Sequence, residues 1–145
     1  MGTTQPSQGG NVYVKVTQTL TDWSGKYLIV CEGEKVAFNG ALSTLDAKNN
    51  YVPVTISNNQ IVLDANYVNA YFTISAYSNG YSIKSGSGFY IGQTSNANGL
   101  ASSSSKSYEN TLSISGGNLT AKSGGAYLVF NNDSDQMRFR YYKSG

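Results

Sequence analysis

The chain has 145 residues, a net charge of +2, no histidine and a single cysteine, Cys31. Only 12% of its residues are charged, and the net charge is too small to predict a nucleic acid or an anionic membrane as partner. The composition excludes imidazole-based catalysis, histidine-ligated metals and an intrachain disulfide. No apolar stretch approaches the ~20 residues of a membrane span, so we also expect no membrane insertion.

The first ten residues, Met1–Gly10, are rich in Gly, Thr, Gln and Ser and contain Pro6. They lack the basic start and apolar middle of a signal peptide. This composition predicts a flexible linker at 1–10, followed by a single domain over 11–145, a length typical of one domain.

About twelve short strands are predicted after the linker, because Val, Tyr and Thr alternate with polar residues and favour strands. Asn-Gly, Gly-Gly, Ser-Gly and Asn-Asn pairs between them suit tight hairpin turns. Only Ala41–Asn50 could carry a turn or two of helix. The expected strands are Val12–Val16, Lys26–Cys31, Val36–Phe38, Val52–Ser57, Ile61–Leu63, Tyr71–Ala76, Tyr81–Lys84, Phe89–Gly92, Thr111–Ser115, Asn118–Lys122, Ala126–Phe130 and Met137–Tyr142.

The motif Gly-x-Tyr-[Leu/Ile] occurs three times, beginning at Gly25, Gly88 and Gly125. The last two copies follow similar pairs of predicted strands, which indicates an internal repeat. Three copies and about twelve strands favour an all-β fold, either a β-trefoil or a trefoil-like closed barrel. The spacing between the copies is uneven, so a two-sheet β-sandwich is the alternative.

Most of the chain after Thr21 resembles a C-terminal accessory β-module of large secreted or surface proteins of gut anaerobic bacteria. The likeness rests on Tyr81–Ser85, Phe89–Leu100 and Met137–Ser144, and on Ser24–Val30 followed by Val36–Gly40. It implies an extracellular or cell-surface location and an accessory role, and it carries no set of functional residues. One predicted repeat is also similar to those of ricin-type and fascin-type trefoils, although the Gln-x-Trp signature of ricin-type lectins is missing.

Members of the accessory family look as if they continue into one more apolar strand after Tyr-Tyr-Lys-Ser, whereas this chain stops at Gly145. Two outcomes are expected. Either an edge of the sheet is left unpaired and open to another protein, or Val12–Val16 fills the vacant place.

Catalysis is not expected, because the eight carboxylates show no spacing that identifies a pair across a cleft. We predict no cofactor and no metal. The oxygen-rich segment Asn131–Gln136 could suit calcium, but a hairpin turn is the favoured interpretation. Arg138 and Arg140 alternate with Phe139 and Tyr141, which favours a half-buried strand with a solvated basic face over a nucleic-acid site.

The aromatic residues are the best positive signal, with twelve Tyr, five Phe and one Trp. A planar ring can stack on the apolar face of a sugar while neutral amides pair with its hydroxyl groups. Trp23, in a turn-like segment, is the leading candidate, although a hydrophobic plug at the end of the barrel is the commoner role for such a residue. Tyr67, Asn69 and Tyr71 form a second candidate loop. The remaining rings are expected in the core, especially Tyr27, Phe38, Phe72, Tyr90, Tyr127 and Phe139.

These observations favour a non-catalytic carbohydrate-binding or surface-attachment module of a secreted multidomain protein. The rival hypothesis is a structural spacer or a protein-interaction module. Exposed neighbouring aromatic rings beside amides would favour binding to a sugar, whereas a polar surface with every ring buried would favour a spacer.

Overall fold

The computed structural model describes residues 2–6 and 11–144, and the fold over these residues is all-β. Its one helical element in this part of the chain is the 3₁₀ turn η1 (Ala65–Tyr67), while the segment 41–50, considered above as a helix, consists of bends and turns. The strands are β1 (Gly2–Pro6), β2 (Val12–Lys15), β3 (Gly25–Cys31), β4 (Val36–Phe38), β5 (Tyr51–Pro53), β6 (Ile56–Ser57), β7 (Gln60–Val62), β8 (Phe72–Tyr77), β9 (Gly80–Ser85), β10 (Tyr90–Gly92), β11 (Ala101–Ser103), β12 (Thr111–Ser115), β13 (Asn118–Ser123), β14 (Ala126–Asn131) and β15 (Arg138–Lys143).

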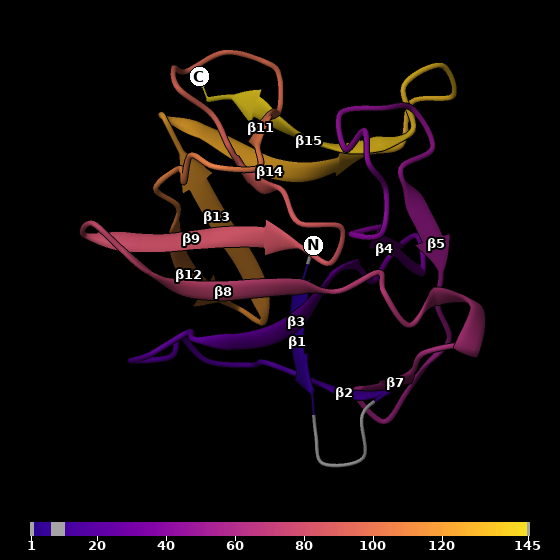
Figure 1. The fold of residues 1–145 in the computed structure, drawn as a ribbon. Coiled ribbons are helices and arrows are strands. Elements are labelled where there is room, and N and C mark those ends of the chain that lie inside the picture. The colour runs from indigo at the N-terminus through magenta and orange to yellow at the C-terminus, as the bar shows by residue number, and fades with distance from the viewer. Residues whose placement is uncertain (1, 7–10, 145) are drawn as a thin grey trace.

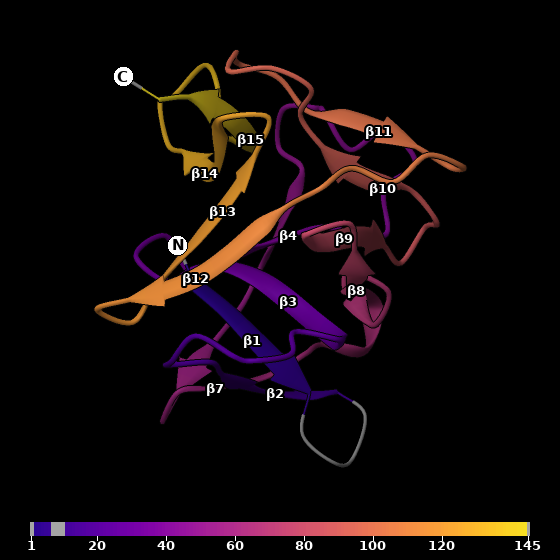
Figure 2. The ribbon, with the colours of Figure 1, turned by 90° about the vertical axis from the view of Figure 1, so that its left-hand side faces the viewer.

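The strands form two hydrogen-bonded sheets, one of eleven strands and one of four (Figure 1). The larger follows the order β11-β10-β9-β8-β3-β1-β2-β7-β6, with β4 paired to β3 and β5. The smaller is the meander β12-β13-β14-β15. Figure 2 shows β8–β11 on one side of the molecule and β12–β14 on the other.

Neither sheet closes on itself within the described residues. Backbone pairing between the two sheets is limited to the isolated bridges Tyr81↔Asn110 and Gly99↔Tyr141, with no continuous ladder. The all-β prediction is therefore confirmed, but the closed barrel is not what forms. Two open sheets facing each other across a core agree with the sandwich alternative.

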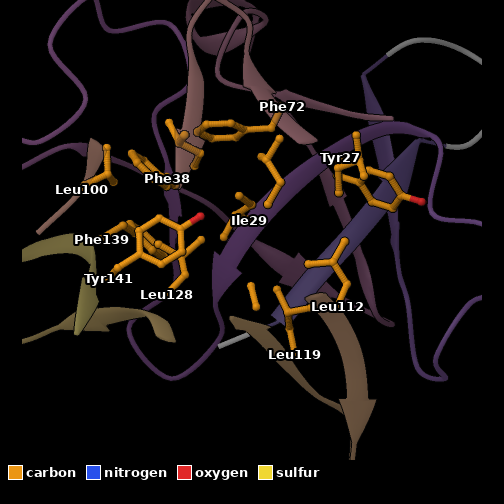
Figure 3. Close-up of a cluster of buried hydrophobic side chains, with 14 of the residues drawn as sticks. Tyr27, Ile29, Phe38, Phe72, Leu100, Leu112, Leu119, Leu128, Phe139 and Tyr141 are labelled. Carbon is orange, nitrogen blue, oxygen red and sulfur yellow. The ribbon is translucent and has the colours of Figure 1, made fainter. Parts of the chain in front are cut away.

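Side chains from both sheets meet in a single main core (Figure 3). Phe38 connects the two sheets, with its ring centroid 4.8 Å from that of Phe72 and 5.2 Å from that of Phe139, which stacks parallel to it. A second, smaller cluster around Tyr13, Leu28 and Val30 packs on the other face of β3. Burying each such side chain contributes roughly 1.5–3 kcal/mol, so these clusters stabilise the pair of sheets.

The repeated Gly-x-Tyr motif has a common backbone role. Gly25, Gly88 and Gly125 have φ values of +147°, +102° and +96°, a region that residues with a side chain rarely adopt. Each glycine opens a strand or lies one or two residues before it. The second and third copies lie at the third strands of similar meanders, β8-β9-β10-β11 and β12-β13-β14-β15, which is the arrangement that a repeat between them predicts.

The linker expectation is wrong for Gly2–Pro6, which form β1 between β2 and β3. Pairing of a strand requires only backbone donors and acceptors, so a segment without large apolar residues can still join a sheet. The rest of the expected linker, residues 1 and 7–10, lies outside the described residues.

The outer edge of β15 is covered by two loops. Asn49 N donates to Met137 O at 2.7 Å, Asn50 bonds the N–H and C=O of Phe139 through its side chain, and Gly99 exchanges two backbone bonds with Tyr141. Lys143 N donates to Asn98 Oδ1 at 2.9 Å. This edge is therefore neither unpaired nor filled by the Val12–Val16 segment, whose strand β2 pairs with β1 and β7.

Buried tyrosines make the fold sensitive to alkali. Burial raises the pKa of Tyr13 and of Tyr27 to about 12, and it also raises the pKa of Tyr141. Below pH ~10 these phenols are protonated in both states and their contribution to stability is complete. Between pH ~10 and ~12 the unfolded chain ionises first, so the folded state should lose about 1.4 kcal/mol per pH unit for each tyrosine.

Urea unfolding measured from pH 8 to pH 12 checks this expectation. The free energy of unfolding should decline above pH ~10, and the Tyr13→Phe variant should decline less steeply because it has one fewer proton to lose. A wild-type curve that stays level to pH 12 would contradict the burial of these phenols.

Candidate functional site

The structure does not place Trp23 on the surface. Its side chain is 1% exposed and belongs to the main core, with its ring centroid 6.0 Å from that of Tyr27. The expectation of an exposed, ligand-stacking indole is therefore wrong. The turn itself is as expected, since Asp22 Oδ1 accepts from Ser24 N at 2.9 Å, and this bond lowers the pKa of the Asp22 carboxyl. The indole ring beside that turn points inward because burial in the main core removes its apolar surface from water.

The residues of the second predicted loop, Tyr67, Asn69 and Tyr71, lie in different local environments. Tyr67 lines a cavity of about 290 Å³, together with Pro53, Val54, Thr55, Val62, Leu63 and Asp64. Tyr71 lies under the ammonium group of Lys26, which is 4.1 Å from its ring centroid. Both tyrosines pack partly against the smaller core cluster, and Asn69 between them is exposed. The structure thus separates all three from Trp23, which lies in the other cluster.

The outer face of the four-stranded sheet carries a group of side chains that we call the tyrosine face. On β14 and β15, Tyr127 is directly opposite Tyr142, Val129 is opposite Arg140, and Asn131 is opposite Arg138. Lys122 on β13 is opposite Tyr127. Residues directly opposite each other on neighbouring strands project from the same side of the sheet. The tyrosine face is defined by Lys122, Tyr127, Val129, Asn131, Arg138, Arg140 and Tyr142.

Part of this face is turned toward solvent, because the alternate residues of the same strands are in the core, but the side chains of Arg138 and Arg140 are only 11% and 27% exposed. Leu128, Phe139 and Tyr141 are at most 1% exposed, whereas Val129 is 38% exposed. Tyr127 and Tyr142 are half-buried. The predicted alternation of Arg138 and Arg140 against Phe139 and Tyr141 is confirmed. The expectation of a solvated basic face is not, because both arginines are largely covered and paired with Asp46.

The ring of Tyr142 lies along the sheet instead of standing upright on it. Its phenol oxygen accepts a hydrogen bond from Asn131 Nδ2 at 3.1 Å. Asn131 is four residues beyond Tyr127, the direct partner of Tyr142, which corresponds to about 13 Å along the strand. The Tyr142 side chain, the hydrogen bond and the Asn131 side chain can together cover that distance only when the ring leans along the strand pair. The result is a tyrosine ring that lies along the sheet with a primary amide at its end.

An ion-pair cluster borders the same face. Arg140 Nε lies 3.1 Å and Arg138 Nη1 lies 3.7 Å from Asp46 Oδ1. Arg138 Nη2 also donates to Gln136 Oε1 at 2.8 Å. Two guanidinium groups therefore share one carboxylate, which fixes both arginine side chains at this end of the tyrosine face.

Other carboxylates have local structural roles. Asp64 Oδ1 accepts from Asn66 N at the start of η1, and Glu109 Oε2 accepts from Asn79 N in the β8–β9 hairpin. Within the part of the chain that the structure describes, no three His, Cys, Asp or Glu side chains gather in a way that could hold a metal ion. Asn131 and Asp133 form a turn, with Asp133 N donating to Asn131 Oδ1 at 2.9 Å, in agreement with the hairpin interpretation of this segment.

Sequence reasoning missed the tyrosine face, although part of its signal was visible. The same alternation that assigns Arg138 and Arg140 to one side of a strand assigns Tyr142 to that side as well. Tyr127 was expected in the core, and the structure instead places it on the outer face while Leu128 points inward. Tyr90, also expected in the core, is likewise half-buried and opposite Lys84.

The fold and this site together define an all-β domain with an open aromatic and amide surface on one sheet. Comparison with known proteins finds no matching family model, no significant match among curated proteins and none among solved structures. Among the described residues, no helix is long and apolar enough to cross a membrane.

Proposed function

We propose that this protein is a non-catalytic carbohydrate-binding module of a secreted or surface-attached multidomain protein, and that it binds glycan through the tyrosine face. The observation that carries the proposal is the pair Tyr127 and Tyr142, opposite each other on the solvent side of the sheet, with Asn131 bonded to Tyr142. The proposal includes the extracellular location and the accessory role that the resemblance implies.

The chemistry of this surface suits sugars. The Tyr142 ring, leaning along the sheet, offers an apolar surface to the CH-rich side of a pyranose. Lys122 Nζ lies 5.5 Å from the centroid of the Tyr127 ring, so a sugar would contact Tyr127 on the part of the ring that the lysine leaves open. The Asn131 amide uses one N–H on Tyr142 and keeps a further donor for a sugar hydroxyl. An extended, open surface of this kind fits a polymer chain better than a small free ligand, because polymer residues can contact it in succession.

Binding should be measured on a glycan array that includes neutral plant polysaccharides and mucin glycans, followed by titration of the best ligand. Tyr142→Ala and Tyr127→Ala should each weaken binding about tenfold, which corresponds to ~1.4 kcal/mol for one stacked ring. Tyr77→Ala is the matched control, because this tyrosine is 41% exposed on a different sheet, in the β8–β9 hairpin. It should bind like the wild type.

Fluorescence of Trp23, the single tryptophan, provides a check of folding in every variant because its ring is buried. Equal binding by all three variants would place the site elsewhere. Absence of binding by the wild type to every glycan would overturn the proposed function and favour a spacer or protein-interaction role.

A further inference from the structure

A second surface of the molecule carries lysines without carboxylate partners. Five strands of the large sheet bring one residue each into a single transverse row: Lys26 on β3 is opposite Thr73 on β8, Thr73 is opposite Lys84 on β9, Lys84 is opposite Tyr90 on β10, and Tyr90 is opposite Ser103 on β11. We call these five residues the lysine row. With strands about 4.8 Å apart, the Cα atoms of Lys26 and Lys84 are about 10 Å apart.

The lysine row lies on the outer side of the sheet. Thr73 is exposed, while its neighbours Phe72 and Ile74 are at most 2% exposed and face the core. Side chains opposite Thr73 on adjacent strands share its side of the sheet. Thr73 is exposed and the other four residues of the row are half-buried, so the row is partly accessible, and it belongs to a different sheet from the tyrosine face.

The ammonium groups of the row's two lysines form cation–π contacts with tyrosine rings. Lys26 Nζ is 4.1 Å from the centroid of Tyr71, and Lys84 Nζ is 5.1 Å from that of Tyr90. Lys106 continues the pattern beyond the end of the row, with its backbone N–H bonded to Ser103 Oγ and its ammonium 5.8 Å from the centroid of Tyr108. A ring quadrupole positions a cation without neutralising it.

The charges of these lysines are not compensated by ion pairs. Among the described residues, the lysine that pairs with a carboxylate is Lys15, 2.7 Å from Glu32, and neither Lys26 nor Lys84 forms such a pair. Two carboxylates on the neighbouring segments are engaged with backbone groups, since Asp22 accepts from Ser24 N and Glu109 accepts from Asn79 N. The ammonium groups of Lys26 and Lys84, with that of Lys106 beyond the end of the row, therefore form a positively charged region beside the hydroxyl groups of Thr73 and Ser103.

We propose that the lysine row is a second binding site, and that its ligand is an acidic polysaccharide carrying carboxylate or sulfate groups. The ammonium groups would bind the anions, and the row's hydroxyl groups would bind sugar hydroxyls. A single-stranded nucleic acid would instead need free ring faces for base stacking, and here the lysines lie over those faces.

Polymers with one common backbone provide the test: dextran, carboxymethyl-dextran and dextran sulfate, each titrated at low and at physiological salt. The wild type should bind both anionic forms at least tenfold more tightly than plain dextran, and added salt should weaken that binding. The preferred derivative identifies the anion as carboxylate or sulfate.

The double variant Lys26→Gln/Lys84→Gln should lose most of this binding, by tenfold or more. The matched control, Lys35→Gln/Lys48→Gln, removes the same charge from two exposed lysines outside the row and should change binding less than twofold. If the two double variants lost the same amount of binding, the effect would be one of net charge alone, and the proposal would be overturned. Tighter binding of a single-stranded oligonucleotide than of either anionic dextran would also overturn it.

This outcome is separable from that of the proposed function. Tyr142→Ala should leave binding to the anionic dextrans unchanged, and the Lys26/Lys84 variant should leave binding to a neutral glycan unchanged. Loss of both activities in either variant would contradict the assignment of two independent sites.

Discussion

Replacing Trp23 with alanine is expected to lower the free energy of unfolding by about 3–5 kcal/mol, the range typical of removing a buried aromatic ring. The side chain is 1% exposed and packs in the main core near Tyr27, so its removal leaves a cavity between the sheets. Chemical denaturation followed by circular dichroism measures the effect, since the variant has no tryptophan fluorescence.

The same variant distinguishes a core residue from a ligand residue. Under conditions where Trp23→Ala remains folded, glycan binding should match that of the wild type. Trp23→Phe should lose less stability, because it retains a ring in the cavity. A Trp23→Ala protein of normal stability with impaired binding would contradict the buried position and restore the interpretation of Trp23 as a ligand contact.

Replacing Asn50 with alanine is expected to be similarly severe, at about 3–5 kcal/mol. This fully buried amide donates to Leu45 O at 2.7 Å and to Phe139 O at 2.9 Å, and it accepts from Phe139 N at 2.8 Å. The substitution leaves these buried backbone groups without hydrogen-bond partners, and each unsatisfied group lowers the free energy of unfolding by about 1–3 kcal/mol.

Urea unfolding of Asn50→Ala beside Asn66→Ala gives the measurement and its control. Asn66 is exposed, and its replacement should change stability by no more than about 0.5 kcal/mol. Equal stability of the two variants would show that β15 does not depend on the Asn50 amide.

The alternation of apolar and polar residues predicted where strands form, but it was less reliable in predicting which face of each strand is buried. The motif Gly-x-Tyr-[Leu/Ile] places its last two residues on opposite sides of a strand, and sequence alone does not say which side is the core. In the third copy Leu128 points inward and Tyr127 outward, whereas in the first both Tyr27 and Leu28 are buried. β3 has a core cluster on each side, so both of its faces are covered.

Other features depended on contacts between distant segments. The expected strand Val52–Ser57 is divided into β5 and β6, since Tyr51–Pro53 pairs with β4 while Ile56–Ser57 turns back onto β7. The tight turn after β6 was predictable, because Asn58 and Asn59 both adopt the positive φ that suits a two-residue hairpin. The hydrogen bond between Asn50 and Phe139 joins residues 89 positions apart, and no local sequence pattern predicts it.

The covering of β15 has a consequence for how copies of this protein behave together. An open strand edge is a template on which a strand from another molecule can extend the sheet. Here Asn50, Asn96 and Asn98 use side-chain amides to occupy the backbone groups of the last strand and of Ser144. A hydrogen bond from a side chain ends the ladder of backbone hydrogen bonds, because a side chain has no row of backbone donors and acceptors with which a strand of another molecule could pair. On this side the molecule is closed to fibre-like growth, so many copies can be crowded on one surface without joining through their final strands.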